Sequence, residues 1–192
     1  LVPFLFRTAP ITHETPMTLH RLSWMILMLG CTAPADSTES EDADEPTPVE
    51  AIQLEPGVNE LTVAQEVDGE TVIRSFLVHL PQDYDGTTET PLLFAFHGNG
   101  GQGEGFVGQF APPVEAREFV GVYPNGIANS WNIGREESTA DDVAFTALIL
   151  DTLEGIAGLD TRKPVGVGFS NGAALVHKIA IESDLFVAIV PQ

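Results

Sequence analysis

Four nearly continuous apolar runs constrain the fold of this chain more than any other feature of its sequence. They are LLFAF (92–96), FVGVYP (119–124), PVGVGF (164–169) and LFVAIV (185–190). Such runs are typical of parallel strands that are covered on both faces. Residues 141–158 lie between two of the runs, and their apolar side chains recur at helical spacing. Strands that alternate with helices predict an α/β fold with a mainly parallel sheet and helices on both faces.

Two further strands are expected ahead of these runs. LTVAQEV (61–67) and TVIRSFLVHL (71–80) are separated by Asp68 and Gly69, a pair that favours a tight hairpin turn. We expect this hairpin to lie at an edge of the sheet.

The start of the predicted helix carries two adjacent acids. Ser138 and Asp141 suit a capping box, and Asp141 and Asp142 stand where carboxylates stabilise the positive end of the helix dipole. We therefore interpret both acids as structural and not as catalytic.

The residues ahead of the hairpin differ in composition from the rest. Residues 32–58 are predicted to be a disordered acidic linker, because TAPADSTESEDADEPTPV (32–49) has almost no large apolar side chains to bury. Residues 59–192 then form the globular domain. The whole chain has 8 basic against 28 acidic residues, a net charge of −20, so nucleic acid and anionic lipid are poor partners.

Residues 1–31 predict an export signal that ends at the single cysteine, Cys31. In RLSWMILMLGC, Arg21 precedes a short apolar stretch and Gly30 stands directly before Cys31, as in a bacterial lipoprotein signal. The stretch is shorter than the roughly 20 residues that span a bilayer as a helix. We expect an exported protein that is secreted or held at the bacterial cell envelope by lipid on Cys31. Ordinary secretion and a buried structural cysteine are the alternatives.

GFSNG (168–172) is the motif with the clearest chemistry. It lies between a predicted strand and the helical stretch NGAALVHKIAIES, which is the placement of a nucleophile elbow. Ser170 is therefore the candidate nucleophile, and the Asn171 amide at the helix start is placed to stabilise an oxyanion. A plain glycine-rich connector is the alternative.

A second glycine-rich loop, HGNGG (97–101), follows the strand at 92–96. Its backbone amides from Gly98 to Gly100 are candidate oxyanion donors, with Asn99 favoured, and His97 is expected to shape the loop. The loop lacks the spacing of a dinucleotide site and the lysine of a phosphate loop. No cofactor motif or metal-ligand cluster is visible in the sequence.

Four stretches in this order carry a resemblance to a known family: FAFHGNGG, VGVYPNGIANSWN, DDVAF and GVGFSNGAAL. Residues 74–192 resemble the secreted esterases of the α/β-hydrolase fold that include feruloyl esterases and polyhydroxybutyrate depolymerase-like enzymes. The resemblance implies a serine esterase that needs no cofactor. It favours feruloyl esters of plant xylan over a polyester, because PNG and SWN look closer to that branch. It also implies that Trp131 and Asn132 lie near the substrate, although Trp131 can equally pack beneath a surface loop.

The catalytic acid and histidine follow the serine in this fold, and only 20 residues follow Gly172. His177 is seven positions beyond Ser170 on the same predicted helix, about 10 Å along its axis, and Asp184 is read as a turn residue. We expect a hydrolase domain truncated at its C-terminal side, with its acid and base beyond residue 192. The missing partners leave a non-catalytic surface lipoprotein as an alternative. A peptidase is disfavoured.

Overall fold

The computed structural model describes residues 52–136 and 138–192. The predicted signal, Cys31 and most of the predicted linker at 32–58 therefore lie outside the described residues. Residues 52–56 form neither helix nor strand, and the first strand begins at Gly57. None of the helices within the described ranges has the length and apolar character of a membrane span.

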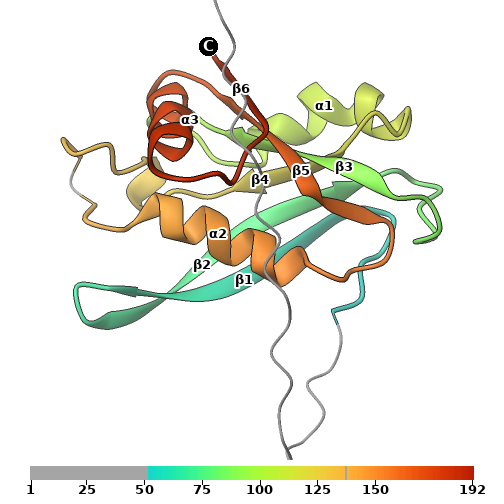
Figure 1. Cartoon of the computed structure of the whole chain (residues 1–192), viewed down its shortest axis with the longest axis horizontal. Helices are drawn as coiled ribbons and strands as arrows, with labels where there is room; N and C mark the ends of the chain where they lie inside the picture. The colour runs from blue at the N-terminus through green and yellow to red at the C-terminus, as the bar shows by residue number, and fades with distance from the viewer. Residues whose placement is uncertain (1–51, 137) are drawn as a thin grey trace, which may run out of the picture. The chain divides into compact units, whose positions relative to one another are not determined.

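The described residues form one six-stranded sheet with the order β1-β2-β4-β3-β5-β6. Its strands are β1 (Gly57–Val67), β2 (Glu70–Leu80), β3 (Thr90–Phe96), β4 (Val120–Pro124), β5 (Leu159–Gly168) and β6 (Ala188–Pro191). β2 is antiparallel to both β1 and β4, whereas β4, β3, β5 and β6 pair in parallel. The predicted mainly parallel sheet is confirmed, and the hairpin lies at its edge as expected (Figure 1).

The hairpin turn has a simple local cause. Asp68 and Gly69 have φ values of 52° and 84°, so both central residues take the left-handed conformation of a type I′ turn. Asp tolerates that conformation better than most residues and glycine adopts it freely.

Three helices connect the parallel strands: α1 (Gly105–Glu115), α2 (Asp142–Leu153) and α3 (Asn171–Glu182). A short 3₁₀ turn, η1 (Ile127–Asn129), follows β4. α2 is shorter than the predicted 141–158, because Glu154 is extended and Gly155 has a φ of 77°. The helix start also differs from the predicted capping box. Asp141 itself caps α2 by accepting hydrogen bonds from the amides of Val143 and Ala144, while Ser138 Oγ accepts one from Ala140 N–H.

The core lies on both faces of the sheet. On β3, Phe94 and Phe96 pack into one apolar cluster with side chains of α2 and α3, and Ala95 between them faces a second cluster. That second cluster includes Phe106 of α1 and Tyr123 of β4. The alternation follows from the period of two in a strand. Figure 1 shows α2 and α3 next to each other and α1 apart from them, so the helices on both faces are confirmed.

Candidate active site

Ser170 occupies a sharp turn between the end of β5 and the start of α3. Its backbone angles, φ 53° and ψ −112°, lie in a sparsely populated region that is costly for a residue with a side chain. Neighbouring strands hold the turn: the Ser170 amide donates to Gln192 O at 2.9 Å, and the Phe169 amide donates to Phe96 O at 3.1 Å. The Ser170 side chain is exposed. The turn thus presents a hydroxyl at the sheet edge where the parallel strands end.

Two glycines make this turn possible. A Cβ added at Gly168 would collide with the carbonyl of Gly172, and one added at Gly172 would collide with the carbonyl of Phe96. Strand and helix therefore approach more closely than any side chain permits, which is the role expected for the glycines of GFSNG.

The backbone amides around Ser170 differ in what they are free to bind. The amides of Ala173 and Ala174 donate to Ser170 O, at 3.0 and 3.2 Å. Gly100 was an expected oxyanion donor, but its amide donates to Asn129 O at 2.8 Å and is not available. The hydrogen bonds between described residues use none of the amides of Gly98, Asn99 and Asn171. These three remain candidate donors.

The glycine-rich loop lies against the elbow. A Cβ at Gly98 would be 3.4 Å from Ser170 Cβ and 3.3 Å from Phe169 O. Asn99, next in the chain, is exposed and lines the same pocket as Ser170. That pocket has a volume of about 580 Å³. The glycine loop, the stretch after β4 and the start of α3 line it, with the residues Asn99, Ile127, Ala128, Ser130, Ile133, Arg135, Glu136, Ser138, Ser170, Asn171 and Ala174.

His97 supports the glycine loop from inside the protein. Its Nδ1 lies 2.9 Å from Gly98 O, and its Nε2 accepts a hydrogen bond from the Gly126 amide at 3.2 Å. Burial lowers the pKa of His97 below its ordinary value, and the hydrogen bond to Gly98 opposes this only in part. The ring is therefore neutral near pH 7, with the proton on Nδ1. Nδ1 thus holds the glycine loop and Nε2 holds the segment after β4, so His97 ties the loop to its neighbour.

Trp131 and Asn132 do not face the pocket, contrary to the expectation that they lie near a substrate. The Trp131 side chain is fully buried, and its Nε1–H donates to His97 O at 2.7 Å. Asn132 uses its carboxamide within its own loop, donating to Ala140 O and accepting from the Gly134 amide, each at 3.0 Å. Trp131 thus supports the loop from the core, and Asn132 braces the loop internally.

Several esterases share parts of this sequence. Probable feruloyl esterase C from Aspergillus niger is 28% identical over 114 residues, which cover 56% of this chain and 41% of that protein. The chain spans less than half the length of the curated relatives it matches. No protein-family model matches it.

Solved structures of similar shape complete the comparison. The poly(3-hydroxybutyrate) depolymerase LpqC from Bordetella parapertussis has a TM-score of 0.58 at 18% identity, over 71% of this chain and 51% of that one. A ferulic acid esterase from Anaeromyces mucronatus has a TM-score of 0.51 at 20% identity, over 73% and 58%. The chain has the α/β-hydrolase fold. Its curated relatives are esterases, so the expected family resemblance is confirmed.

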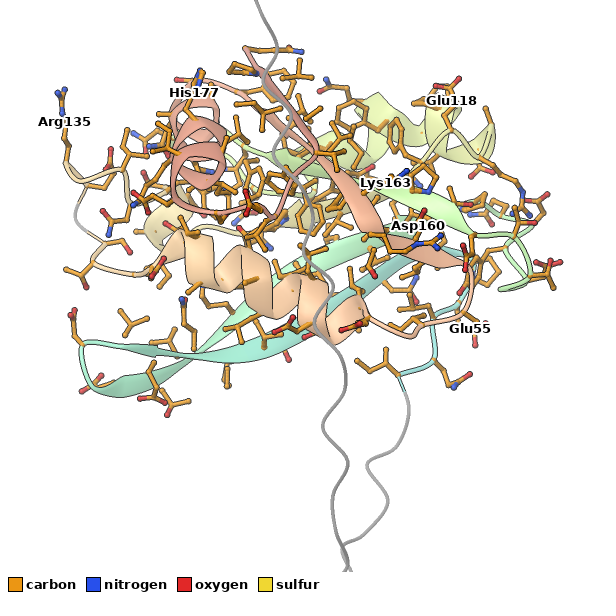
Figure 2. All side chains as sticks on the ribbon, in the orientation of Figure 1. Glu55, Glu118, Arg135, Asp160, Lys163 and His177 are labelled. Atoms are coloured by element: carbon orange, nitrogen blue, oxygen red, sulfur yellow. The ribbon has the colours of Figure 1, made fainter. Side chains whose placement is uncertain are left out.

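In this α/β-hydrolase fold, no histidine among the described residues is hydrogen-bonded to Ser170. The hydrogen bonds among them include none to Ser170 Oγ, and His97 is committed elsewhere. His177 is exposed on α3, and Figure 2 shows its side chain at the surface of that helix. Within the described ranges, no group of three or more His, Cys, Asp or Glu side chains could hold a metal ion.

Sequence reasoning missed a buried ion pair behind the α/β-hydrolase pocket. Arg74 of β2 and Asp142 of α2 are both about 1% exposed, with Nη2 and Oδ1 2.7 Å apart. The Arg74 guanidinium also lies 3.6 Å from the centre of the Phe145 ring, and Asp142 Oδ2 accepts from the Asn132 amide at 2.6 Å. Burial raises the pKa of Asp142, while the charge of Arg74 opposes that rise. An arginine inside the apolar strand pattern of 71–80 was the available signal.

Glu136 was also missed, because nothing in its sequence context distinguishes it. It lines the pocket beside Ser170, and its Oε2 accepts from the amides of Ile133 and Arg135, at 2.9 and 3.0 Å. The hydrogen bond from the Ile133 amide, and to a lesser extent that from Arg135, lowers the pKa of Glu136. The carboxylate is therefore ionised at neutral pH. Figure 2 shows the neighbouring Arg135 side chain extending away from the domain.

Proposed function

We propose that the full-length protein is an exported serine esterase in which Ser170 is the nucleophile. The observation that carries this proposal is the strained Ser170 turn, φ 53° and ψ −112°, which opens on a pocket at the start of a helix. A backbone strained at one exposed serine is a common sign of function. The esterase names of the curated relatives add independent support.

The proposed reaction proceeds in two steps. Ser170 Oγ attacks the ester carbonyl carbon as a histidine takes the hydroxyl proton, and the tetrahedral oxyanion accepts hydrogen bonds from backbone amides. The Asn171 amide and those of Gly98 and Asn99 are the candidate donors. Collapse breaks the carbon–oxygen bond and expels the alcohol, which receives the proton. Water then attacks the acyl-enzyme by the same route, releasing the carboxylic acid and restoring Ser170.

The base and the acid that orients it are proposed to lie beyond residue 192 in the full-length protein. The short span of the chain relative to its relatives supports this, as does the lack of a partner for Ser170 Oγ among described residues. A general base must lie within about 3 Å of the proton it takes. Residues 1–192 alone are therefore expected to hydrolyse no ester.

Feruloyl esters of plant xylan are the proposed substrates. Two of the curated relatives carry the name feruloyl esterase C. A polyhydroxybutyrate-like polyester is the second candidate, and the depolymerase among the structural neighbours is its support.

The test is an assay of the full-length protein on methyl ferulate, short nitrophenyl esters and polyhydroxybutyrate, together with labelling by a fluorophosphonate. We expect ester hydrolysis and covalent labelling, with methyl ferulate preferred to the polyester. Ser170→Ala should abolish both activities, while substrate binding survives better than turnover because the amide donors remain. His177→Gln, on the exposed side of α3, is the matched control and should behave as the wild type.

Wild-type activity in Ser170→Ala would refute the nucleophile assignment. A full-length protein that neither hydrolyses esters nor takes up the label would instead favour the non-catalytic surface lipoprotein.

A further inference from the structure

The Asn171 side chain makes an unusually complete set of contacts beside the nucleophile. Its Oδ1 accepts hydrogen bonds from the Trp131 amide at 2.7 Å and from Ser130 Oγ at 3.3 Å. Its Nδ2 donates to Trp131 O at 3.1 Å and to Glu136 Oε1 at 3.4 Å. A carboxamide has two acceptor sites and two N–H groups. All four are used, and all four reach the segment 130–136.

The contact with Trp131 is bidentate. The carboxamide binds both the N–H and the C=O of one residue, as a neighbouring strand would. Only a side chain with a donor and an acceptor in one plane can do this. Aspartate has the same size but no N–H, so its second oxygen would face the Trp131 carbonyl and the Glu136 carboxylate.

Trp131 extends the connection to the glycine loop. Its indole N–H donates to His97 O at 2.7 Å, and its ring lies against the His97 ring with centroids 4.7 Å apart. His97 in turn contacts Gly98 O through Nδ1. A chain of contacts therefore runs from Asn171 through Trp131 and His97 to Gly98. One end of this chain of contacts is Asn171 and the other is Gly98, and both residues have candidate oxyanion amides. No hydrogen bond between described residues links Asn171 directly to Gly98 or Asn99.

We propose that the Asn171 side chain is a positioning residue that sets the distance between the Asn171 amide and the amides of Gly98 and Asn99. This inference rests on the proposed esterase function. An oxyanion hole needs donors fixed to within about 0.5 Å of their working positions before the reaction begins. The Asn171 backbone contributes one donor. Its side chain holds Trp131, and Trp131 contacts His97 at the start of the loop that carries the other donors.

The experiment uses the full-length protein with Asn171→Asp and Asn171→Ala, and His177→Gln as the control on the same helix. Hydrogen exchange of the peptide that covers 130–136 reports the loop, and steady-state kinetics on a short nitrophenyl ester reports the oxyanion hole. Asn171→Asp preserves side-chain size, so it remains informative if the alanine variant folds poorly. Thermal unfolding of each variant checks that the domain is intact.

We expect faster exchange across 130–136 in both Asn171 variants and a fall in kcat of about 10- to 100-fold, a part of the loss caused by removing one oxyanion donor. KM should change less than threefold, because the oxyanion hole contributes to the transition state and little to ground-state binding of a small ester. Asn171→Asp should be at least as impaired as Asn171→Ala, because it adds repulsion to the lost contact. His177→Gln should match the wild type in both measurements.

A kcat within twofold of wild type in both Asn171 variants would overturn the proposal, whether or not exchange changed. The proposal would also be overturned if KM rose by as large a factor as kcat fell and hydrogen exchange across 130–136 stayed unchanged. If the wild type neither hydrolyses esters nor takes up a fluorophosphonate, the esterase proposal fails. The loop-holding role of Asn171 then stands or falls on the exchange measurement alone.

Discussion

At the scale of single residues, the elbow concentrates strain that its surroundings must offset. Ser170 has a positive φ with a side chain present, a state that costs on the order of 1–3 kcal/mol. Two backbone hydrogen bonds, from the amides of Ser170 and Phe169, tie the turn to the ends of β6 and β3. The flanking glycines remove the collisions that would otherwise push β5 and α3 apart. The strain persists because several neighbours fix the same geometry.

Two helical glycines provide a matched test of this packing. Gly172→Ala places a methyl group against the Phe96 carbonyl, whereas Gly108→Ala in α1 meets nothing within 4 Å. We expect Gly172→Ala to lower the free energy of unfolding by about 2 kcal/mol, as overpacked sites do. Gly108→Ala should raise it by about 0.5–1 kcal/mol, because alanine favours helix. Urea denaturation midpoints measure both. Equal midpoints for the two variants would mean that the close approach at Gly172 is not needed.

At the scale of elements, the Arg74–Asp142 pair connects parts that are distant in sequence. Arg74 Nη1 donates to Gln65 Oε1 of β1 at 2.9 Å, and Asp142 accepts from the Asn132 amide in the pocket wall. Gln65 Nε2 donates to Asp141 O at 2.6 Å. The hairpin, α2 and the 130–136 segment thereby share one buried polar network. Such a network is costly to leave half satisfied.

Replacing one partner of this pair should therefore be severe. Arg74→Met or Asp142→Asn should each lower the free energy of unfolding by about 3 kcal/mol, because each leaves a buried group without its partner. The double variant should lose less free energy of unfolding than the two single variants together, since no charge then remains buried alone. Arg162→Met is the control: its ion pair with Glu89 is exposed, so it should cost less than about 1 kcal/mol. Chemical denaturation of the four variants gives these values. If the losses of Arg74→Met and Asp142→Asn simply added in the double variant, the two side chains would not be coupled.

At the scale of the whole molecule, the sequence predicts a domain carried on a tether. The net charge of −20 is expected to repel phosphate backbones. The acidic stretch at 32–58 is expected to separate the domain from a membrane surface if Cys31 is acylated. Cys31 is the chain's one cysteine, so acylation is open to a direct test.

Expression from Met17 in a bacterium, with a fatty-acid probe in the medium, tests the predicted anchor. The wild-type protein should take up the probe and fractionate with membranes, because Gly30 and Cys31 follow the apolar stretch as in a lipoprotein signal. Cys31→Ser should lose both properties. Equal labelling of the two proteins would exclude lipid attachment at this cysteine.

The sequence by itself was sufficient for the sheet and the elbow, because both depend on local patterns. Apolar runs report burial on both faces of a strand, and Asp68–Gly69 encodes a turn in two residues. The glycines of GFSNG report a backbone approach that no side chain allows. Helix ends were less predictable. Helix α1, which contains Pro112 and Pro113, could not be delimited, and α2 stops early because a glycine takes a left-handed conformation.

Only the tertiary structure decided which polar groups face the pocket. Trp131 and Asn132 stand in a loop in either case, but the Trp131 side chain is buried against His97 and the Asn132 carboxamide bonds within its own loop. The Gly100 amide is withdrawn by Asn129, and the Asn171 side chain finds its partners forty residues away. The arginine within the apolar pattern of 71–80 was a signal for Arg74, but only the folded structure shows that its partner is Asp142 of α2. A hydrogen bond between distant segments depends on where the core places both, and no local pattern contains that information.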